Sequence, residues 1–187
     1  SSEVYDLLMK KETSLKKLEK AKTEKIKKEK KEKKIDIKRE WYEKFRWFYS
    51  SEGLLCIGGR DATSNEIVIK KHMDDEDVVF HTEMPGSPFF VIKTKGKPPK
   101  KETIEETAQA TASYSKAWKI GINTADVFYV NPEQVTKKAQ PGEYVAKGAF
   151  VIYGKKHELT AELKLAIGLK DNKIIGGPVN SIKAHTK

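Results

Sequence analysis

The chain has 187 residues, with 37 Lys or Arg against 27 Asp or Glu, so its formal net charge is +10. A surplus of this size favours partners that are polyanions, such as RNA. With 37% hydrophobic residues, the chain can build one globular core with an appendage. No stretch approaches the roughly 18 consecutive apolar residues of a membrane span, which excludes an integral membrane protein.

The single cysteine, Cys56, lies in an apolar run, which excludes a disulfide framework and a cysteine-based zinc site. The chain begins with Ser1 and has no apolar signal core, so we expect an excised piece of a protein from a reducing, cytoplasmic compartment. The histidines lack H-x-x-x-H spacing, and no Ser or Cys nucleophile stands in a recognisable motif. We therefore expect no metal, no cofactor and no catalysis.

Residues 3–34 contain neither Gly nor Pro and are rich in good helix formers, which predicts one long helix. An apolar stripe at heptad-like spacing marks one side of this helix: Val4, Leu8, Leu15 and Leu18. Beyond Ala21 the stripe fades into Lys and Glu. We expect residues 1–39 to be one arm of a coiled coil whose partner helix lies upstream in the same protein. A solvated charged helix without a partner is the alternative.

The composition changes abruptly where six aromatic residues fall close together: Trp41, Tyr42, Phe45, Trp47, Phe48 and Tyr49. This density predicts the start of a folded domain over residues 40–187. Aromatic side chains bury large apolar areas, so we expect Trp41 and Trp47 to be mainly structural and buried.

Hairpins and helices are predicted to follow one another along this domain. Strands are expected at residues 45–50, 54–57, 78–82, 89–94, 125–130, 149–153, 162–169 and 173–175. Helices are expected from about 61 to 73 and from about 103 to 121. This order predicts an α+β domain with a mostly antiparallel sheet and two packed helices.

The segment from Gly58 to Glu66 joins a strand to a helix start, where backbone N–H groups and the helix dipole can hold a phosphate. It contains Arg60, Asp61 and Asn65. Walker-loop and dinucleotide-fingerprint spacings are both missing, so nucleotide hydrolysis is not predicted. The alternative is a structural turn in which Arg60 pairs with Asp61 or Glu66.

His81, beside Glu83 at a strand end, can stack on a nucleotide, act as an acid or base, or donate to a backbone carbonyl. Basic residues recur near the ends of predicted elements: Lys70, Lys71, Lys93, Lys95, Lys97, Lys137, Lys138, Lys147, Lys155 and Lys156. Such a rim suits RNA phosphates, with Tyr144 and Tyr153 available to stack on bases. A solubilising surface is the alternative.

Three stretches together resemble a known family: residues 41–66, with Gly53-Leu54-Leu55-Cys56-Ile57-Gly58-Gly59-Arg60-Asp61-Ala62; residues 77–93, with Phe80-His81-Thr82; and residues 141–156, with Pro141-Gly142-Glu143-Tyr144-Val145. In this order they are similar to NFACT-R, the RNA-binding module of the NFACT family. Fibronectin-binding protein A homologues and the eukaryotic nuclear export mediator factor belong to that family. The resemblance covers residues 40–170, and residues 1–39 resemble the end of the family's coiled-coil region.

The resemblance implies a cytoplasmic ribosome-associated quality control factor that binds the large ribosomal subunit carrying a stalled peptidyl-tRNA. It also implies recruitment of tRNA for C-terminal tailing of the nascent chain, with large-subunit RNA, tRNA and ribosomal proteins as partners. An archaeal source is expected. RNA-binding residues are expected to be Arg60, Asp61, Asn65, Lys70, Lys71, His81, Lys93, Lys95, Lys147, Lys155 and Lys156. Two alternatives stay open: a protein-interaction module using the aromatic cluster and the helix, and an RNA-processing enzyme centred on His81.

Overall fold

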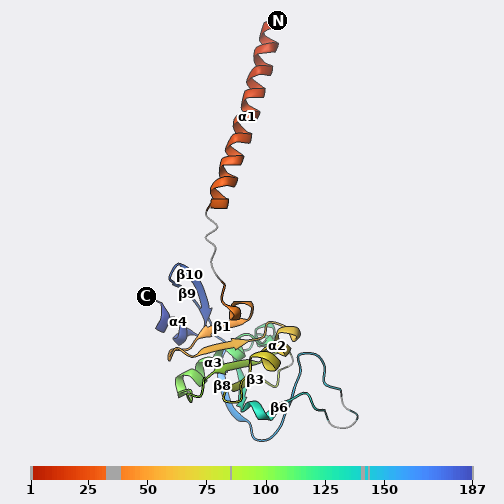
Figure 1. The fold of residues 1–187 in the computed structure, drawn as a ribbon, viewed down its shortest axis with the longest axis vertical. Coiled ribbons are helices and arrows are strands. Elements are labelled where there is room, and N and C mark those ends of the chain that lie inside the picture. The colour runs from red at the N-terminus through yellow and green to blue at the C-terminus, as the bar shows by residue number, and fades with distance from the viewer. Residues whose placement is uncertain (1, 33–38, 85, 140–141, 143, 187) are drawn as a thin grey trace. The chain divides into compact units, whose positions relative to one another are not determined.

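The structure is a computed structural model that describes residues 2–32, 39–84, 86–139, 142 and 144–186 (Figure 1). Contacts divide the chain into two units, Ser1–Glu40 and Trp41–Lys187. Helix α1 (Ser2–Glu32) confirms the predicted long helix, although its expected end at residue 34 lies outside the described residues. Among the helices of the described ranges, none combines the length and apolar character needed to cross a bilayer.

The second unit is built on a six-stranded antiparallel sheet with the strand order β1-β2-β4-β3-β5-β8. Its strands are β1 (Arg46–Tyr49), β2 (Leu55–Gly58), β3 (Val78–His81), β4 (Phe90–Lys93), β5 (Thr124–Val130) and β8 (His157–Glu162). Helices α2 (Ala62–His72) and α3 (Lys101–Ser113) pack on its two faces. The α+β fold and the mostly antiparallel sheet are confirmed.

Alternation along the strands separates two apolar cores. Phe80 and Phe90 face α3, whereas Val79 and Val91 face α2, and all four side chains are fully buried. Successive strand residues point to opposite faces of a sheet, so each strand supplies both cores. Small residues on the buried side of α3, such as Ala108, allow this helix to lie close to the sheet.

Helix α3 and the expected strand at 162–169 are each shorter than predicted. The helix ends at Ser113, and a 3-10 helix, η2 (Lys116–Ile120), follows, with the Ser115 hydroxyl accepting from the N–H of Ala117. The expected strand corresponds mainly to β9 (Ala166–Lys170), because the Ser113 hydroxyl bonds both the N–H and the C=O of Lys164 in the segment between β8 and β9. The sequence did not predict the strand over residues 157–161. The bonds of Lys164 are tertiary, whereas the cap of η2 is local.

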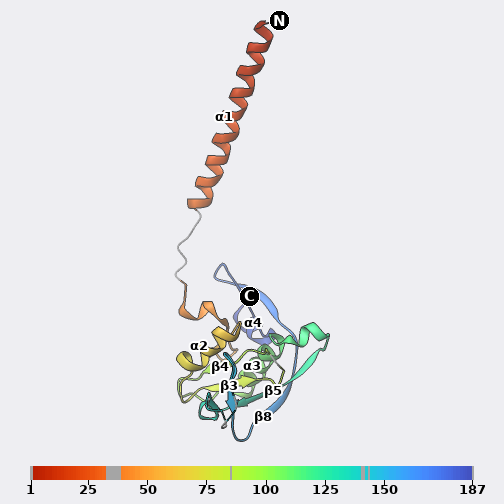
Figure 2. The same cartoon turned by 90° about the vertical axis from the view of Figure 1, so that its right-hand side faces the viewer.

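The C-terminal part adds elements around the sheet. Strands β9 and β10 (Lys173–Gly177) form the predicted hairpin around Asp171 and Asn172, which both have positive φ. The sequence did not predict α4 (Val179–His185), which lies beside this hairpin in Figure 2. Its Ser181 hydroxyl donates to the carbonyl of Tyr49 at 2.6 Å. The remaining short elements are η1 (Trp41–Lys44), η3 (Pro132–Gln134), β6 (Val135–Thr136) and β7 (Val151–Ile152).

The aromatic cluster at the start of the domain is only partly buried. Trp41 is 45% exposed and stacks on His72 with 4.6 Å between ring centroids, so the prediction that it is buried was wrong. Trp47 is half-buried and packs with Tyr42, whereas Phe45 is fully inside the α2-facing core. The position of Trp41 just before the first strand explains its partial exposure.

The connection between β6 and β7 is fastened to the start of α2. Gly148 has φ +78°, and a Cβ there would lie 2.5 Å from Cα of Ala62, so only glycine fits. Its N–H donates to Glu66 Oε2 at 2.9 Å, and Lys137 Nζ lies 2.8 Å from the same carboxylate. Hydrogen bonds from Lys137 and then Lys70 lower the pKa of Glu66 to about 2. Glu66 therefore holds this connection as a carboxylate.

Replacing a fully buried ring should cost far more stability than replacing the exposed one. Phe80→Ala should lower the free energy of unfolding by about 3–5 kcal/mol, because it opens a cavity beneath α3. Trp41→Ala should cost only about 1 kcal/mol, since much of its surface stays in water. Urea unfolding of both variants measures the difference, and equal losses would contradict the assigned positions.

Glu66→Gln should lower stability at pH 7 by about 1–2 kcal/mol, because the charged hydrogen bonds of the carboxylate weaken. The pKa of Glu66 is about 2 in the folded chain against a usual 4.5, so its contribution is complete above about pH 4.5. It should fall below that pH and nearly vanish near pH 2. Urea midpoints of both proteins at several pH values measure this, and a difference that stays constant with pH would refute the role.

Candidate nucleic-acid interface

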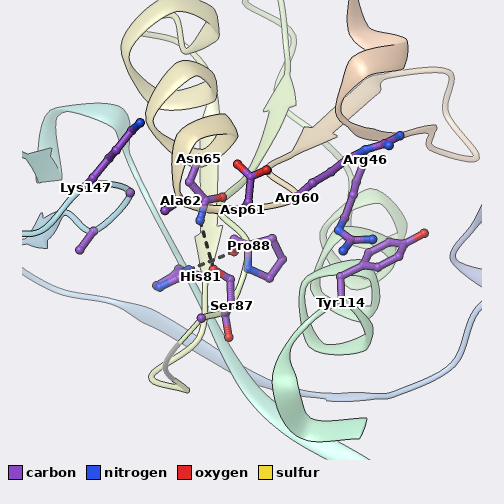
Figure 3. Close-up of a pocket in the computed structure, with 14 residues that line it drawn as sticks. Arg46, Arg60, Asp61, Ala62, Asn65, His81, Ser87, Pro88, Tyr114 and Lys147 are labelled. Carbon is purple, nitrogen blue, oxygen red and sulfur yellow. Dashed lines mark hydrogen bonds between the residues drawn. The ribbon is translucent and has the colours of Figure 1, made fainter. Parts of the chain in front are cut away.

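A pocket of about 440 Å³ opens beyond the first residue of β1 and the last residue of β2 (Figure 3). Segments far apart in the sequence meet there: the turn before α2, the residues before β4, the end of α3 and the connection before β7. Its charged side chains are three cations and one carboxylate: Arg46, Arg60, Lys147 and Asp61. The pocket is therefore suited to an anion.

Asn65 ties the turn before α2 to the residues before β4. A Cβ at Gly59 would lie 1.9 Å from Asn65 Oδ1, so only glycine allows this approach. Asn65 Oδ1 accepts from the N–H of Phe89 at 3.0 Å, and its Nδ2 donates to the carbonyl of Ser87 at 3.4 Å. Both polar atoms of this buried side chain are used within the domain, so Asn65 shapes the pocket.

The expected phosphate cradle of backbone N–H groups is not formed by this turn. The N–H groups of Arg60 and Asp61 donate to the Ser64 hydroxyl at 2.7 and 2.9 Å. Asp61 in turn caps α2, accepting from the N–H of Ser64 at 2.7 Å, and this bond lowers the pKa of Asp61. These two N–H groups are therefore not free to bind an anion, and the basic side chains of the pocket are its candidate ligands.

The alternative interpretation of this turn had Arg60 paired with Asp61 or Glu66, and the structure shows neither pair. Its Nη2 donates to the carbonyl of Phe45 at 3.1 Å and to that of Glu43 at 3.4 Å. These bonds to neutral groups leave the positive charge of Arg60 without a carboxylate partner among the described residues. Arg60 is exposed and remains able to bind an anion.

Arg46 is the site residue that the sequence reasoning missed. Its guanidinium lies 4.1 Å from the ring centroid of Tyr114, at the end of α3. Its Nε is buried without a hydrogen-bond partner in the described part of the chain, and no carboxylate there pairs with it. Desolvation lowers the pKa of Arg46, the interaction with Tyr114 opposes this shift, and the nearby charge of Arg60 adds to it. The sequence did hold one sign of this role. Arg46 stands in a strand that is otherwise aromatic, two residues before the buried Phe48 and therefore on the same face of the sheet.

His81 is held in one orientation by its neighbours. Its ring stacks on Phe89, with 3.9 Å between centroids and an interplanar angle of 3°. Its Nδ1 lies 3.0 Å from the carbonyl oxygen of Pro88, so this nitrogen carries the proton, because a carbonyl only accepts. Burial lowers the pKa of His81, which favours the neutral ring. Of the three roles predicted for His81, the geometry fits that of a donor to a backbone carbonyl. Phe89 covers one face of the His81 ring.

The predicted RNA-binding residues fall into two groups. The pocket brings together Arg60, Asp61, Asn65, His81 and Lys147. The residues that do not line it are Lys70, Lys71, Lys93, Lys95, Lys155 and Lys156. The sequence therefore predicted the part of the pocket formed by the turn before α2. It also predicted six lysines that the structure places outside the pocket.

Several lysines outside the pocket serve the fold. The side chain of Lys93 is 10% exposed, and its Nζ bonds Asp77 and donates to the carbonyl of His72 at 2.6 Å. Lys70 pairs with Glu66, and Lys156 pairs with Glu83. By contrast, the rest of this group is exposed: Lys71, Lys95 and Lys155. Of the six predicted residues that do not line the pocket, these three have no ion pair in the described part of the chain.

The single cysteine, Cys56, lies in the α3-facing core. Burial raises the pKa of the Cys56 thiol to about 12, so this only cysteine stays protonated. The described ranges contain no group of three or more His, Cys, Asp or Glu side chains placed to hold a metal ion. The arrangement of the pocket fits binding of an anion.

Known proteins similar to this chain were found at the levels of sequence and fold. The archaeal Rqc2 homolog aRqcH of Methanocaldococcus jannaschii is 48% identical over 137 residues, which are 73% of this chain and 20% of that protein. The human ribosome quality control complex subunit NEMF is 41% identical over 120 residues, 64% of this chain and 11% of that protein. The chain thus spans about a fifth or less of these curated relatives.

The C-terminal part of the fibronectin/fibrinogen-binding protein from Streptococcus suis shares the fold. The TM-score is 0.55 at 17% sequence identity, covering 76% of this chain and 50% of the other. The NFACT protein RNA binding domain matches residues 44–154, a range that contains every residue named for the pocket. This chain therefore belongs to the family of NFACT protein RNA-binding domains.

Proposed function

We propose that this chain is the RNA-binding module of a ribosome quality control factor, and that its pocket binds an RNA phosphate. The observation that carries the proposal is the pair of arginines, Arg46 and Arg60, which share the pocket with Lys147 and have no carboxylate partner among the described residues. Two cations this close repel each other unless an anion binds between them. The family match supports RNA as the source of that anion.

Arg46 is suited to bind a phosphate through hydrogen bonds as well as charge. The guanidinium is planar by itself and lies over the Tyr114 ring, which limits its movement, and its N–H groups point outward in its own plane. A planar fork of this kind binds two phosphate oxygens at once. Among the described residues that line the pocket there is one carboxylate, Asp61, which accepts hydrogen bonds from Ser64 and forms no ion pair with Arg46.

At the level of the longer protein, we propose the role that the relatives' names suggest. The relatives are named as ribosome quality control complex subunits. We propose that the factor acts in the cytoplasm, binds the large ribosomal subunit carrying a stalled peptidyl-tRNA and supports tRNA recruitment for C-terminal tailing. Large-subunit RNA, tRNA and ribosomal proteins are the proposed partners. We propose no catalysis by this module itself.

Helix α1 supports a separate contact with protein. Its stripe residues Leu8, Leu15 and Leu18 are each more than half exposed. A helix with an apolar seam of this kind gains stability when a second helix covers it. We propose that a helix from elsewhere in the longer protein covers this seam, which is what the coiled-coil prediction expects. Disulfide crosslinking of cysteines placed along the seam in the longer protein tests this, and a pattern without heptad spacing would rule it out.

The first test compares Arg46→Lys with Lys95→Ala, a control outside the pocket. Arg46→Lys keeps the charge but loses the fork, so we expect RNA affinity to fall about 10-fold or more, as for the loss of charged hydrogen bonds. Lys95→Ala should change it little. Fluorescence anisotropy with a short RNA measures both, beside the melting temperature. Unchanged affinity in folded Arg46→Lys would contradict the proposal.

The second test uses salt to separate RNA binding from a protein-interaction module. RNA affinity of the unmodified chain should fall steeply with salt, and Arg60→Ala should reduce the slope of log affinity against log salt by about 1. Arg60 bonds only carbonyls, so its loss should cost at most about 1 kcal/mol of stability. Affinity independent of salt would favour the protein-interaction alternative.

A further inference from the structure

A second hollow lies beside the pocket, on the far side of the residues between β3 and β4. Its volume is about 660 Å³ and its apolar residues include Met84, Ile120 and Ile122. Lys116 lines this hollow, while Gly86 lines the pocket, and a Cβ at Gly86 would lie only 2.6 Å from Lys116 Cε. The two hollows are therefore neighbours, with the contact between Gly86 and Lys116 lying between them.

The 3-10 helix η2, which leads away from Tyr114, presents an exposed indole. Trp118 is 55% exposed, although its indole N–H already donates to the carbonyl of Ser113. This bond fixes the ring and satisfies its polar atom, so what remains in water is apolar ring surface. Such a ring offers a stacking platform for a nucleobase, a contact that every base can make.

The charges around Trp118 favour a polyanion over an apolar protein segment. Lys116 and Lys119 flank it in η2, both exposed and without an ion pair in the described part of the chain. Of the two carboxylates of the hollow, Glu83 pairs with Lys156, whereas Asp126 accepts from the Thr160 hydroxyl at 2.7 Å and keeps its charge. The cations Lys116 and Lys119 together outnumber this one unpaired carboxylate. A basic surface interleaved with an aromatic ring is typical of single-stranded nucleic-acid binding.

We infer that an unpaired stretch of RNA runs from the Arg46 pocket across Gly86 and Lys116 to Trp118, which stacks on one of its bases. This inference rests on the proposed function and adds the kind of RNA recognised. A base in a duplex is stacked on both sides within its helix and cannot open a face to the indole. The Trp118 contact therefore selects unpaired over paired RNA.

The test measures affinities of the 187-residue chain for a single-stranded RNA and for a duplex of the same sequence. Trp118→Ala should weaken single-strand binding about 5- to 100-fold, the range expected for the loss of one stacked base, and leave duplex binding nearly unchanged. Trp118→Phe should recover most of the loss. Trp41→Ala, which removes an exposed indole away from both hollows, is the matched control and should match the unmodified chain.

A second measurement does not depend on the stability of Trp118→Ala. In a Trp41→Phe/Trp47→Phe background, Trp118 is the only tryptophan, and single-stranded RNA should quench its fluorescence while duplex should not. Equal single-strand affinity for folded Trp118→Ala and the unmodified chain, or no quenching at saturating RNA, would overturn the inference. If Arg46→Lys still lowers RNA affinity in that case, the proposed function stands without it. Absence of RNA binding by the unmodified chain would reject both.

Discussion

The close approach of Gly59 to Asn65 is the constraint on which the rest of the site depends. No Cβ fits between them, and the amide of Asn65 holds the backbone of Ser87 and Phe89. This clamp joins the turn before α2 to the residues before β4, and so forms part of the wall of the pocket. The docking of Gly148 on the first turn of α2 closes the other side. Gly59 and Gly148 stand where two segments approach too closely for a side chain. These contacts fix the backbone of the pocket, and the charged side chains around it determine which ligand it prefers.

The charges around the pocket give it a preference for an anion. Ion pairs engage some of the cations, such as Lys93 with Asp77, and others are spread over the surface, so a net charge of +10 says little about where an anion binds. Arg46 and Arg60 differ because their partners in the described part of the chain are neutral, Tyr114 for Arg46 and two carbonyls for Arg60, and burial removes water from Arg46. A desolvated guanidinium without a carboxylate is costly to the fold, and a bound phosphate offsets that cost. Function is therefore concentrated at a few unpaired charges.

Local signals in the sequence predicted much of this fold. Strand alternation and turn residues located the hairpins, and the cap at Asp61 located the start of α2. The prediction failed where distant partners decide the structure, as where Ser113 ends α3 and bonds Lys164. In the site, the turn with Arg60 was found because its residues are consecutive. Arg46 was missed because its environment is made by Tyr114, a residue distant in sequence, and no local pattern encodes that contact.

The central claim is that the guanidinium of Arg46 binds an RNA phosphate. NMR spectra of the arginine side-chain N–H groups test it most directly, with the Arg46 Nε–H resonance assigned by its absence in Arg46→Lys. Its buried Nε has no hydrogen-bond partner among the described residues, so its environment must change when an anion arrives. The account predicts that a short single-stranded RNA shifts the Arg46 Nε–H resonance strongly and slows its exchange with water. An unmoved Arg46 resonance at saturating RNA, with shifts confined to surface lysines, would contradict it.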